Sequence, residues 1–505
     1  MHLDSTACYQ AMKAHDTRFD GRFFVGVSST HIYCRPICRV RMPQQKNCTF
    51  HPSAAAAEAA GFRPCLRCRP ELAPGFAATE ASAKLARTAA RMIEDGVAND
   101  IDLSLVAENI GVTDRHLRRI FSEEFGVSPV QYAQTHRLLL AKRLLTDTSL
   151  PVADVAFASG FSSVRRMNAL FAERYGFSPT RLRKDGADND AARETDALTF
   201  VLPYRPPYDW ARLLAFFEMR AIPGVESVAG GVYRRVIRID GDADKTKADW
   251  LEVSHLPKRN ALQLRFSSTL ASSTQTVLSR TKQVFDVAAD PQEIALALGD
   301  LAAGAHGLRL PGAFDGFELA MRAILGQQVT VKAARTLATR FVDAFGAPIA
   351  TPFLDLTRTF PLASEVATLT RDDIGRLGIV GARAEAMIAI ARWVCGTGKL
   401  EPFSRLRERE PNEARHVLAA NADPVTTIAA LTSIKGIGPW TAHYIAMRAL
   451  AWPDAWPPQD VALLNAMNLP NTAKGQREAD VVAEAWRPWR SYAVLHTWRK
   501  LEKTT

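Results

Sequence analysis

The sequence LTSIKGIGPWTAHYIAMRALAWPDAWPPQD, residues 431–460, joins a glycine turn between two helical segments to one isolated acid. The apolar pattern predicts a helix ending near Ser433, a turn over residues 435–439, and a second helix opening at residues 440–441. Glycines in such a turn expose backbone N–H groups at the next helix's N-terminus, where the helix dipole favours an anion. We therefore expect this turn to bind a phosphate, although a turn built only for helix packing would use the same residues.

The acid, Asp460, follows a proline-rich segment, residues 453–458, and precedes the apolar helical run 461–467. A carboxylate in that place can face inward towards a bound substrate. It can equally act only as the N-cap of the helix that follows. The pattern alone keeps both interpretations open.

The composition favours a protein of several folded domains with a polyanionic partner. The chain has 505 residues, 47% of them hydrophobic, enough for roughly three domains that each bury a core. Its formal net charge of +10 and pI of about 9.3 favour nucleic acid as the partner. Because no apolar run approaches the roughly twenty residues of a membrane span and no signal peptide is visible, we expect a cytoplasmic protein without a membrane partner.

Four of the seven cysteines lie close together in residues 1–78, which we expect to form a small zinc domain. They form two pairs, Cys34 with Cys38 and Cys65 with Cys68, separated by a loop. Four thiolates at this spacing suit one tetrahedral Zn²⁺, and so small a domain needs such a cross-link. Taken alone, the spacing favours a zinc site with a purely structural role.

A repeat in residues 79–185 indicates two tandem helical units. Its first copy is Phe121, Gly126, Ser128 and Pro129, and its second copy is Phe171, Gly176, Ser178 and Pro179. In each copy a glycine turn, Gly111-Val112 or Gly160-Phe161, is followed by a Thr or Ser cap and then by a helix with one apolar face and one basic face. This order predicts a double helix-turn-helix DNA-binding domain. The basic residues are Arg115, Arg118, Arg119, Arg165 and Arg166. A solvated charged face on a helical bundle is the alternative.

The rest of the chain divides by composition. Residues 186–197 are acidic and almost free of large apolar side chains, as in a flexible linker. Residues 198–285 alternate between apolar and polar positions, which predicts a small antiparallel α+β subdomain. Residues 286–505 are mostly helical, and we expect two helical lobes with the site between them. The predicted fold class is thus multidomain α+β.

The hairpin and its aspartate resemble the helix-hairpin-helix DNA glycosylases, most closely the AlkA-type 3-methyladenine glycosylases. PPYDW (206–210), ILGQQV (324–329) and WRPWRSYAVLHTW (486–498) extend the likeness over roughly the last three hundred residues. The resemblance implies that Asp460 stabilises positive charge on the sugar while the damaged base leaves. It implies a base pocket of Trp440, Tyr444 and Trp498, although each aromatic residue alone would fit a core. The implied DNA contacts are Lys435, Gly436, Gly438, Thr441, Gln327 and Gln328.

The sequence also departs from related patterns. Trp440 stands where strand-nicking glycosylases place a Schiff-base lysine, so we expect a monofunctional enzyme. Gln328 stands where the AlkA family has an apolar wedge that fills the gap left by the flipped base. No Pro-Cys-His-Arg acceptor sequence occurs, so repair of guanine alkylated at O6 is not expected.

The cysteine domain resembles the N-terminal domain of Ada-type proteins in FDGRFFVGV (19–27), IYCRPICRVR (32–41) and AAGFRPCLRCRP (59–70). That family moves a methyl group from DNA methylphosphotriesters to a zinc-bound cysteine, by position Cys34, with the other three cysteines as ligands. Methylation removes one negative charge from the site, which strengthens DNA binding by nearby arginines. These are Arg35, Arg39, Arg41 and Arg67. Cys8, Cys48 and Cys395 are expected to be ordinary thiols.

The helix-turn-helix region resembles the AraC-type transcription regulators, whose two units dock in successive major grooves. We therefore expect a monomeric alkylation-response protein that binds one zinc ion, alkylated DNA and promoter DNA, with RNA polymerase as a further partner. Methyl acceptance would switch on transcription, and the C-terminal part would excise N-alkylated purines. The rival hypothesis is a regulator with a structural zinc and a catalytically inactive glycosylase-like module.

Overall fold

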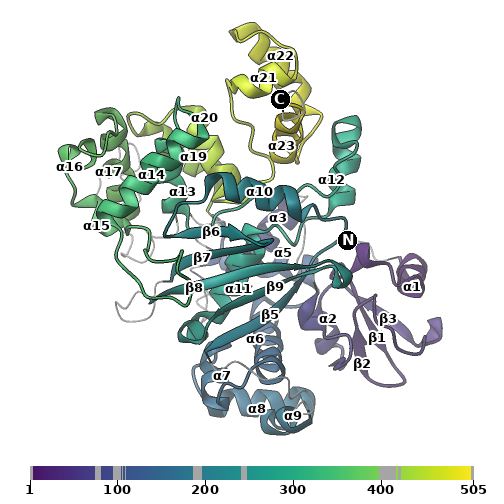
Figure 1. The fold of residues 1–505 in the computed structure, drawn as a ribbon. Helices are drawn as coiled ribbons and strands as arrows, with labels where there is room; N and C mark the ends of the chain where they lie inside the picture. Colours follow the sequence, from purple (N-terminus) through teal and green to yellow (C-terminus); the bar gives the residue numbers. More distant parts are fainter. Residues whose placement is uncertain are drawn as a thin grey trace.

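The computed structural model describes residues 4–73, 81–94, 104, 106–107, 110–185, 196–239, 247–396, 417–418 and 422–501. Figure 1 shows a sheet near the middle of the molecule, with the N-terminal domain beside it and helices above and below it. The multidomain α+β architecture expected from the sequence is confirmed. Among these residues, no helix combines the length and the apolar character that crossing a membrane demands.

A four-stranded sheet brings the two cysteine pairs of the N-terminal domain together. The elements are α1 (Ser5–Lys13), β1 (Phe24–Val27), β2 (Ile32–Cys34), β3 (Cys48–His51), α2 (Ala54–Ala59) and β4 (Arg63–Pro64). The strand order is β3-β1-β2-β4, and only β2 and β4 run parallel. Parallel strands end at the same edge of a sheet. Cys34, at the end of β2, therefore emerges beside Cys65, which follows β4.

The helix-turn-helix region has the predicted tandem form. Its helices are α3 (Ala81–Glu94), α5 (Asp114–Phe125), α6 (Pro129–Asp147), α7 (Val152–Ala158), α8 (Val164–Tyr175) and α9 (Pro179–Asp185). Thr113 and Ser163 cap α5 and α8, the two helices that carry the predicted arginines. Both helices end at a left-handed glycine, Gly126 with φ 74° and Gly176 with φ 75°, which explains why the repeat keeps a glycine there.

An antiparallel sheet of five strands forms the third unit. Its elements are β5 (Ala197–Pro203), α10 (Trp210–Arg220), β6 (Glu226–Ala229), β7 (Val232–Ile239), β8 (Lys247–Leu256), β9 (Ala261–Ser267) and α11 (Thr274–Val284). The strand order is β5-β9-β8-β7-β6. Burial alternates along β5, so one face of the sheet rests on a core, as the alternating sequence predicted.

The remaining helices form two lobes with separate cores. They are α12 (Pro291–Leu298), α13 (Gly316–Leu325), α14 (Val331–Phe345), α15 (Ala363–Ala367), α16 (Arg371–Gly375), α17 (Gly381–Val394), α19 (Pro424–Ser433), α20 (Pro439–Arg448), α21 (Val461–Ala466), α22 (Ala473–Glu484) and α23 (Arg490–Leu501). One core lies among α13 to α20, and the other joins α12 with α21 to α23. Tyr444 and Trp452 pack against both cores, so the end of α20 marks the boundary between the lobes.

The units are joined more closely than a chain of domains on linkers would be. Leu144 and Phe171 of the helix-turn-helix region lie in the same hydrophobic core as Phe200 of the sheet. Arg143 on α6 lies 4.7 Å above the Phe200 ring and donates a 2.7 Å hydrogen bond to the Val201 carbonyl. Of the predicted linker, residues 186–195 lie outside the described part of the chain.

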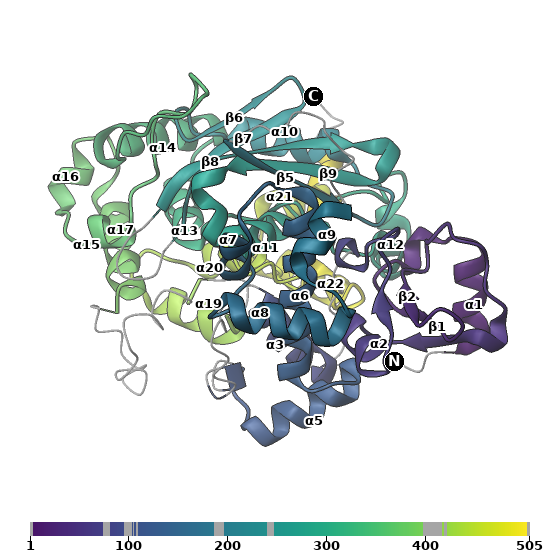
Figure 2. The same cartoon turned by 90° about the horizontal axis from the view of Figure 1, so that it is seen from below.

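The N-terminal domain also contacts the helical lobe next to α12 (Figure 2). Arg22 pairs with Glu293 at 2.8 Å and also with Asp290. Arg205 donates a 3.0 Å hydrogen bond to the carbonyl oxygen of Asp20. These contacts join the zinc domain to the glycosylase-like part of the chain.

A buried carboxyl, Glu58, holds the zinc domain to the helix-turn-helix region. Its oxygens accept hydrogen bonds from Tyr33 next to Cys34 (3.0 Å), Thr135 on α6 (3.0 Å) and Tyr175 on α8 (3.4 Å). Burial raises the pKa of Glu58 from 4.5 to about 7, although these bonds and Arg174 oppose the rise. A raised pKa means that the protonated carboxyl favours the folded state.

We therefore expect Glu58 to make folding pH-dependent. Its contribution to the free energy of unfolding is full below about pH 4.5, falls up to about pH 7 and stays low above it. The total change is about 3 kcal/mol at 1.36 kcal/mol per pKa unit. Glu58→Gln keeps the shape without the charge, so urea unfolding should show it to be more stable than the wild type at pH 8 and similar at pH 5. An equal stability difference at both pH values would contradict this assignment.

Candidate functional site

Asp460 lies at the N-terminus of α21 with both carboxylate oxygens engaged. Its Oδ1 accepts the Leu463 backbone N–H at 2.9 Å, so it does cap the helix. Its Oδ2 accepts the Trp440 indole N–H at 2.8 Å, and the Trp498 indole approaches Oδ1 at 3.4 Å. Only 5% of the residue is exposed. The carboxylate thus faces inward while it caps, and the three predicted residues Asp460, Trp440 and Trp498 come together.

The third predicted aromatic residue, Tyr444, lies one helical turn after Trp440 on α20. The two rings stack with their centroids 5.2 Å apart and an angle of 8° between their planes. Arg448 donates a 2.9 Å hydrogen bond to the Tyr444 hydroxyl. Burial raises the pKa of Tyr444, but Arg448 and Arg220 together outweigh burial and leave the pKa below its ordinary value. A cationic environment at one end of the stack is a feature that the sequence did not indicate.

The hairpin joins α19 to α20 in the predicted way. Gly436 has a φ of 92°, a conformation that favours glycine, and a Cβ there would lie only 3.3 Å from the Cβ of Ala386 on α17, so a larger residue would also be crowded. Lys435, Gly436 and Gly438 are exposed. No side chain caps α20, whose N-cap residue is Gly438. The first-turn N–H groups of this helix are therefore not used by a side-chain cap and suit a phosphate.

Gln327 and Thr441, predicted as DNA contacts, make contacts within the protein instead. The Gln327 amide donates hydrogen bonds to the Gly436 carbonyl at 3.0 Å and to the Thr441 hydroxyl at 3.1 Å. Thr441 is only 4% exposed. The sequence suggested that polar residues near the hairpin face the DNA, whereas the side chains of these two residues are hydrogen-bonded to each other. Gln328, by contrast, is exposed and has a left-handed φ of 54°.

A clamp that the sequence reasoning missed fixes the turn before Asp460. Arg490, at the start of α23, donates to Asp454 Oδ1 at 2.7 Å and to Asp454 Oδ2 at 2.9 Å. Ser491 donates to the Trp452 carbonyl at 2.7 Å. The same helix carries Trp498 to the carboxylate of Asp460. The available signal was the pair of arginines, Arg487 and Arg490, within the tryptophan-rich motif WRPWRSYAVLHTW, because a buried arginine requires an acidic partner.

The four predicted zinc ligands also come together. The Sγ atoms of Cys34, Cys38, Cys65 and Cys68 all lie within 4.8 Å of one another. Four sulfurs about 2.3 Å from one tetrahedral ion lie about 3.8 Å apart, so the set fits a single Zn²⁺. The Arg35 N–H donates to Cys68 at 3.3 Å and the Cys68 N–H to Cys65 at 3.5 Å. Within the described residues, no backbone N–H donates to Cys34 or Cys38, which leaves these sulfurs more electron-rich.

The arginines around the zinc centre differ in their exposure to solvent. Arg39, Arg41 and Arg67 are exposed, as a DNA-binding role requires. Arg35 is not: it is 5% exposed, and its guanidinium forms a two-point ion pair with Asp20. The expectation that Arg35 attracts DNA is therefore wrong, because the neighbouring carboxylate already neutralises its charge.

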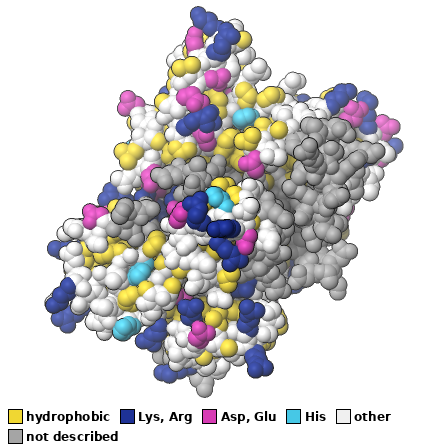
Figure 3. Space-filling model, turned by 180° about the vertical axis from the view of Figure 1, so that it is seen from behind, with side chains coloured by type: hydrophobic (Ala, Val, Ile, Leu, Met, Phe, Trp, Pro, Cys, Tyr) yellow, Lys and Arg dark blue, Asp and Glu magenta, His cyan; other side chains and the backbone are white. Residues whose placement is uncertain are grey.

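The predicted arginines of the helix-turn-helix region are all on the surface. Arg118 pairs with Asp114 at 3.0 Å and Arg119 with Glu123 at 2.9 Å, each within α5. Arg115 on α5 and the arginines Arg165 and Arg166 on α8 are exposed. Figure 3 shows Lys and Arg side chains of the described residues in several separate places on the rear face.

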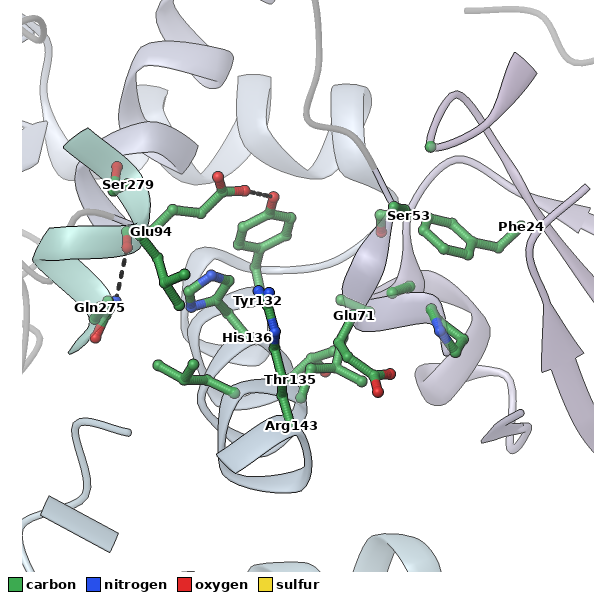
Figure 4. A pocket seen from close by; sticks show the side chains of 18 of the residues that line it. Phe24, Ser53, Glu71, Glu94, Tyr132, Thr135, His136, Arg143, Gln275 and Ser279 are labelled. Carbon is green, nitrogen blue, oxygen red and sulfur yellow. Dashed lines mark hydrogen bonds between the residues drawn. The ribbon is translucent and has the colours of Figure 1, made fainter. Parts of the chain in front are cut away.

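A cavity lies between the units. Its volume is about 140 Å³, and its lining includes Tyr132 and His136 on α6, Glu71 of the zinc domain and Gln275 on α11 (Figure 4). Tyr132 donates to Glu94 at 2.6 Å, and Gln275 donates to the Glu94 carbonyl at 2.9 Å. No residue of the hairpin lines this cavity. It marks the junction of the zinc domain, the helix-turn-helix region and α11.

Known proteins match every part of this arrangement. Residues 7–71 match the metal binding domain of Ada, and residues 106–185 match a helix-turn-helix domain. Residues 199–315 match the AlkA N-terminal domain, and residues 321–491 match the HhH-GPD superfamily base excision DNA repair proteins. The resemblances of the zinc domain, the helix-turn-helix region and the glycosylase-like part seen in the sequence are thereby confirmed.

Three relatives show how far the likeness extends. The chain is 35% identical, over 99% of its length and 97% of theirs, to a Mycobacterium tuberculosis protein described as a probable bifunctional transcriptional activator/DNA repair enzyme AlkA. It is 31% identical, over 59% of its length, to 96% of Escherichia coli DNA-3-methyladenine glycosylase 2. It is 30% identical, over 37% of its length, to 50% of the Escherichia coli bifunctional transcriptional activator/DNA repair enzyme Ada. The chain belongs to the AlkA family of bifunctional transcriptional activator/DNA repair proteins.

Proposed function

We propose that the C-terminal part of the chain is a monofunctional DNA glycosylase that excises N-alkylated purines such as 3-methyladenine. The observation that carries this proposal is the inward-facing carboxylate of Asp460, which accepts hydrogen bonds from the indole of Trp440, directly after the hairpin, and from the indole of Trp498 on α23. A buried anion fixed by N–H donors is suited to positive charge that develops in a transition state.

The chemistry follows from these positions. The hairpin amides hold a phosphate of the strand, and the damaged nucleotide leaves the stack to reach the aromatic residues. The bond between base and C1′ breaks with its electron pair on the base, and Asp460 stabilises the cationic sugar that remains. Water then adds its oxygen to C1′ and releases a proton to solvent. No amine of the chain takes part, because Trp440 stands at the position of a Schiff-base lysine.

Wild-type protein and methylated duplex DNA provide the test. We expect free 3-methyladenine to appear in the chromatogram while the DNA strand stays intact until alkali is added. Strand cleavage without alkali would contradict the monofunctional mechanism. If no base were released, the rival hypothesis of an inactive glycosylase-like module would stand.

We infer a second activity at the zinc centre, where Cys34 accepts a methyl group from a DNA methylphosphotriester. A bound Zn²⁺ keeps a thiol deprotonated at neutral pH. The Cys34 sulfur attacks the methyl carbon, the carbon–oxygen bond breaks, and the phosphodiester leaves as an anion. Neither thiols nor water remove the methyl group from the thioether that forms, so each chain accepts only one methyl group. The loss of a negative charge beside Arg39, Arg41 and Arg67 then raises DNA affinity and switches on transcription.

Promoter binding in this proposal needs only one chain. The tandem units place α5 and α8 in a single polypeptide, which supplies the two major-groove contacts that other regulators obtain by dimerisation. We therefore infer a monomer on promoter DNA, with RNA polymerase as its protein partner. Sedimentation of the complex with a promoter duplex would show one chain per site, and two chains per site would contradict this inference.

The two indoles should differ in their importance. Trp440→Phe keeps an aromatic ring but removes the 2.8 Å hydrogen bond to Asp460, whereas Trp498→Phe removes the longer contact of 3.4 Å. We expect single-turnover base release to fall about tenfold for Trp440→Phe and less for Trp498→Phe. A larger loss for Trp498→Phe would reverse our ranking of the two donors.

A further inference from the structure

One side chain, Gln327, connects the loop between α13 and α14 to the hairpin. Both N–H groups of its amide are used, one for the Gly436 carbonyl at 3.0 Å and one for the Thr441 hydroxyl at 3.1 Å. One acceptor, Gly436, lies within the turn that is proposed to hold phosphate, and the other, Thr441, lies in the first turn of α20. The amide of Gln327 therefore fixes the loop to this turn and to the start of the helix that follows it.

A second contact reaches the same loop from α17. Arg383 donates to the backbone carbonyl of Gln327, and Gly436 rests against Ala382 and Ala386 on that helix. Loop, hairpin and α17 thus hold one another at a single residue. Because these elements are joined by direct contacts, we expect the distances between them to stay the same when the hairpin binds DNA.

The residues next to Gln327 form an exposed tip. Gln328 has the left-handed φ of 54°, which non-glycine residues adopt only where the surrounding structure enforces it. Gln328 and Val329 are exposed, Val329 to 37%. This strained tip lies one residue from the amide that grips the hairpin.

We propose that Gln327 is a positioning residue that sets the distance between the Gln328–Val329 tip and the phosphate held by the hairpin. The proposal rests on the glycosylase function proposed above. Extrusion of a base leaves a gap at a fixed distance from the phosphates of its strand, so a filler must stand at that distance from the grip. Gln327 touches neither base nor sugar, and it acts through the tip.

The test compares duplex with single-stranded alkylated DNA, because only a duplex requires a gap to be filled. Gln327→Met preserves length and removes both donors. We expect single-turnover base release from the duplex to fall about 10- to 100-fold, since a misplacement of about 1 Å costs up to that much. Release from single strands should stay within about twofold. Gln292→Met, at an exposed glutamine whose side-chain oxygen accepts a hydrogen bond from Arg18, is the control and should match the wild type on both substrates.

An equal loss on both substrates would show general damage to the fold and overturn the proposal, as would no loss on either. Thr441→Val supplies a further check, because it removes only the hydroxyl acceptor. Its duplex-specific loss should not add to that of Gln327→Met in the double variant. Full additivity would mean that the two side chains act separately.

A binding measurement keeps the proposal distinct from the glycosylase assignment. In a duplex with a stable abasic analogue, 2-aminopurine opposite the gap reports by fluorescence whether a residue has filled it, and no cleavage is needed. Wild-type protein should change the fluorescence, and Gln327→Met should lower the amplitude at saturating protein. If the wild type releases no base, the catalytic assignment fails while this comparison still decides the role of Gln327.

Discussion

Asp460→Asn is expected to lower the single-turnover release of 3-methyladenine by about 10³-fold, the scale of a preorganised electrostatic group in a buried site. Asparagine caps helices as well as aspartate does, so the 2.9 Å bond to Leu463 survives and the fold is retained. Its amide carries no negative charge and cannot balance the cationic sugar. Rates measured with enzyme in excess over alkylated duplex DNA would isolate the chemical step from product release.

A matched control exists in the same lobe. Asp480 Oδ1 accepts the Trp456 indole N–H at 2.9 Å, which reproduces the tryptophan–carboxylate contact away from the hairpin. Asp480→Asn should therefore stay within about twofold of the wild type, since it removes the same charge from a place where no sugar binds. Equal losses for the two variants would show that the effect is structural.

Cys34→Ser is expected to abolish methyl acceptance, while the wild type takes up one methyl per chain and then stops. Serine lacks a sulfur that stays deprotonated at neutral pH, so no nucleophile remains at this position. Mass spectrometry after incubation with DNA that carries methylphosphotriesters would place the methyl on the Cys34 peptide of the wild type. Base excision by the variant should change by less than about twofold, because the two sites use different residues.

Cys48→Ser provides the comparison for this experiment. Cys48 is a half-buried thiol of the same domain outside the zinc set, so its variant should still accept one methyl. Zinc content, measured in parallel, separates loss of the nucleophile from loss of the metal. A methyl found on Cys38 of the wild type would move the acceptor to the other cysteine that receives no backbone N–H.

The sequence predicted well those features that are written locally. The glycines that end α5 and α8, Gly126 and Gly176, and the serine that caps α6, Ser128, were visible as a repeat, because each depends on a few adjacent residues. The zinc set was visible because metal geometry restricts cysteine spacing. Asp460 was visible because its setting is also local: it is an acid between a proline-rich turn and an apolar run.

Features that depend on distant partners were not predicted. Arg35 reads as one more basic residue, and only the fold brings it to Asp20 and buries it. Gln327 reads as a polar loop residue, yet its partners lie more than a hundred positions further along the chain. The core shared by the helix-turn-helix region and the five-stranded sheet was also missed, because amphipathic patterns show that a face is buried but not what covers it.

The proposed role of Asp460 is to stabilise positive charge on a sugar beside the strand that the hairpin holds. This role is tested by the dissociation constant for a duplex with a cationic pyrrolidine in place of the abasic sugar, relative to one with neutral tetrahydrofuran. We predict that the wild type binds the cation at least about tenfold more tightly and that Asp460→Asn loses this preference. The same preference in both proteins, or none in the wild type, would contradict the account.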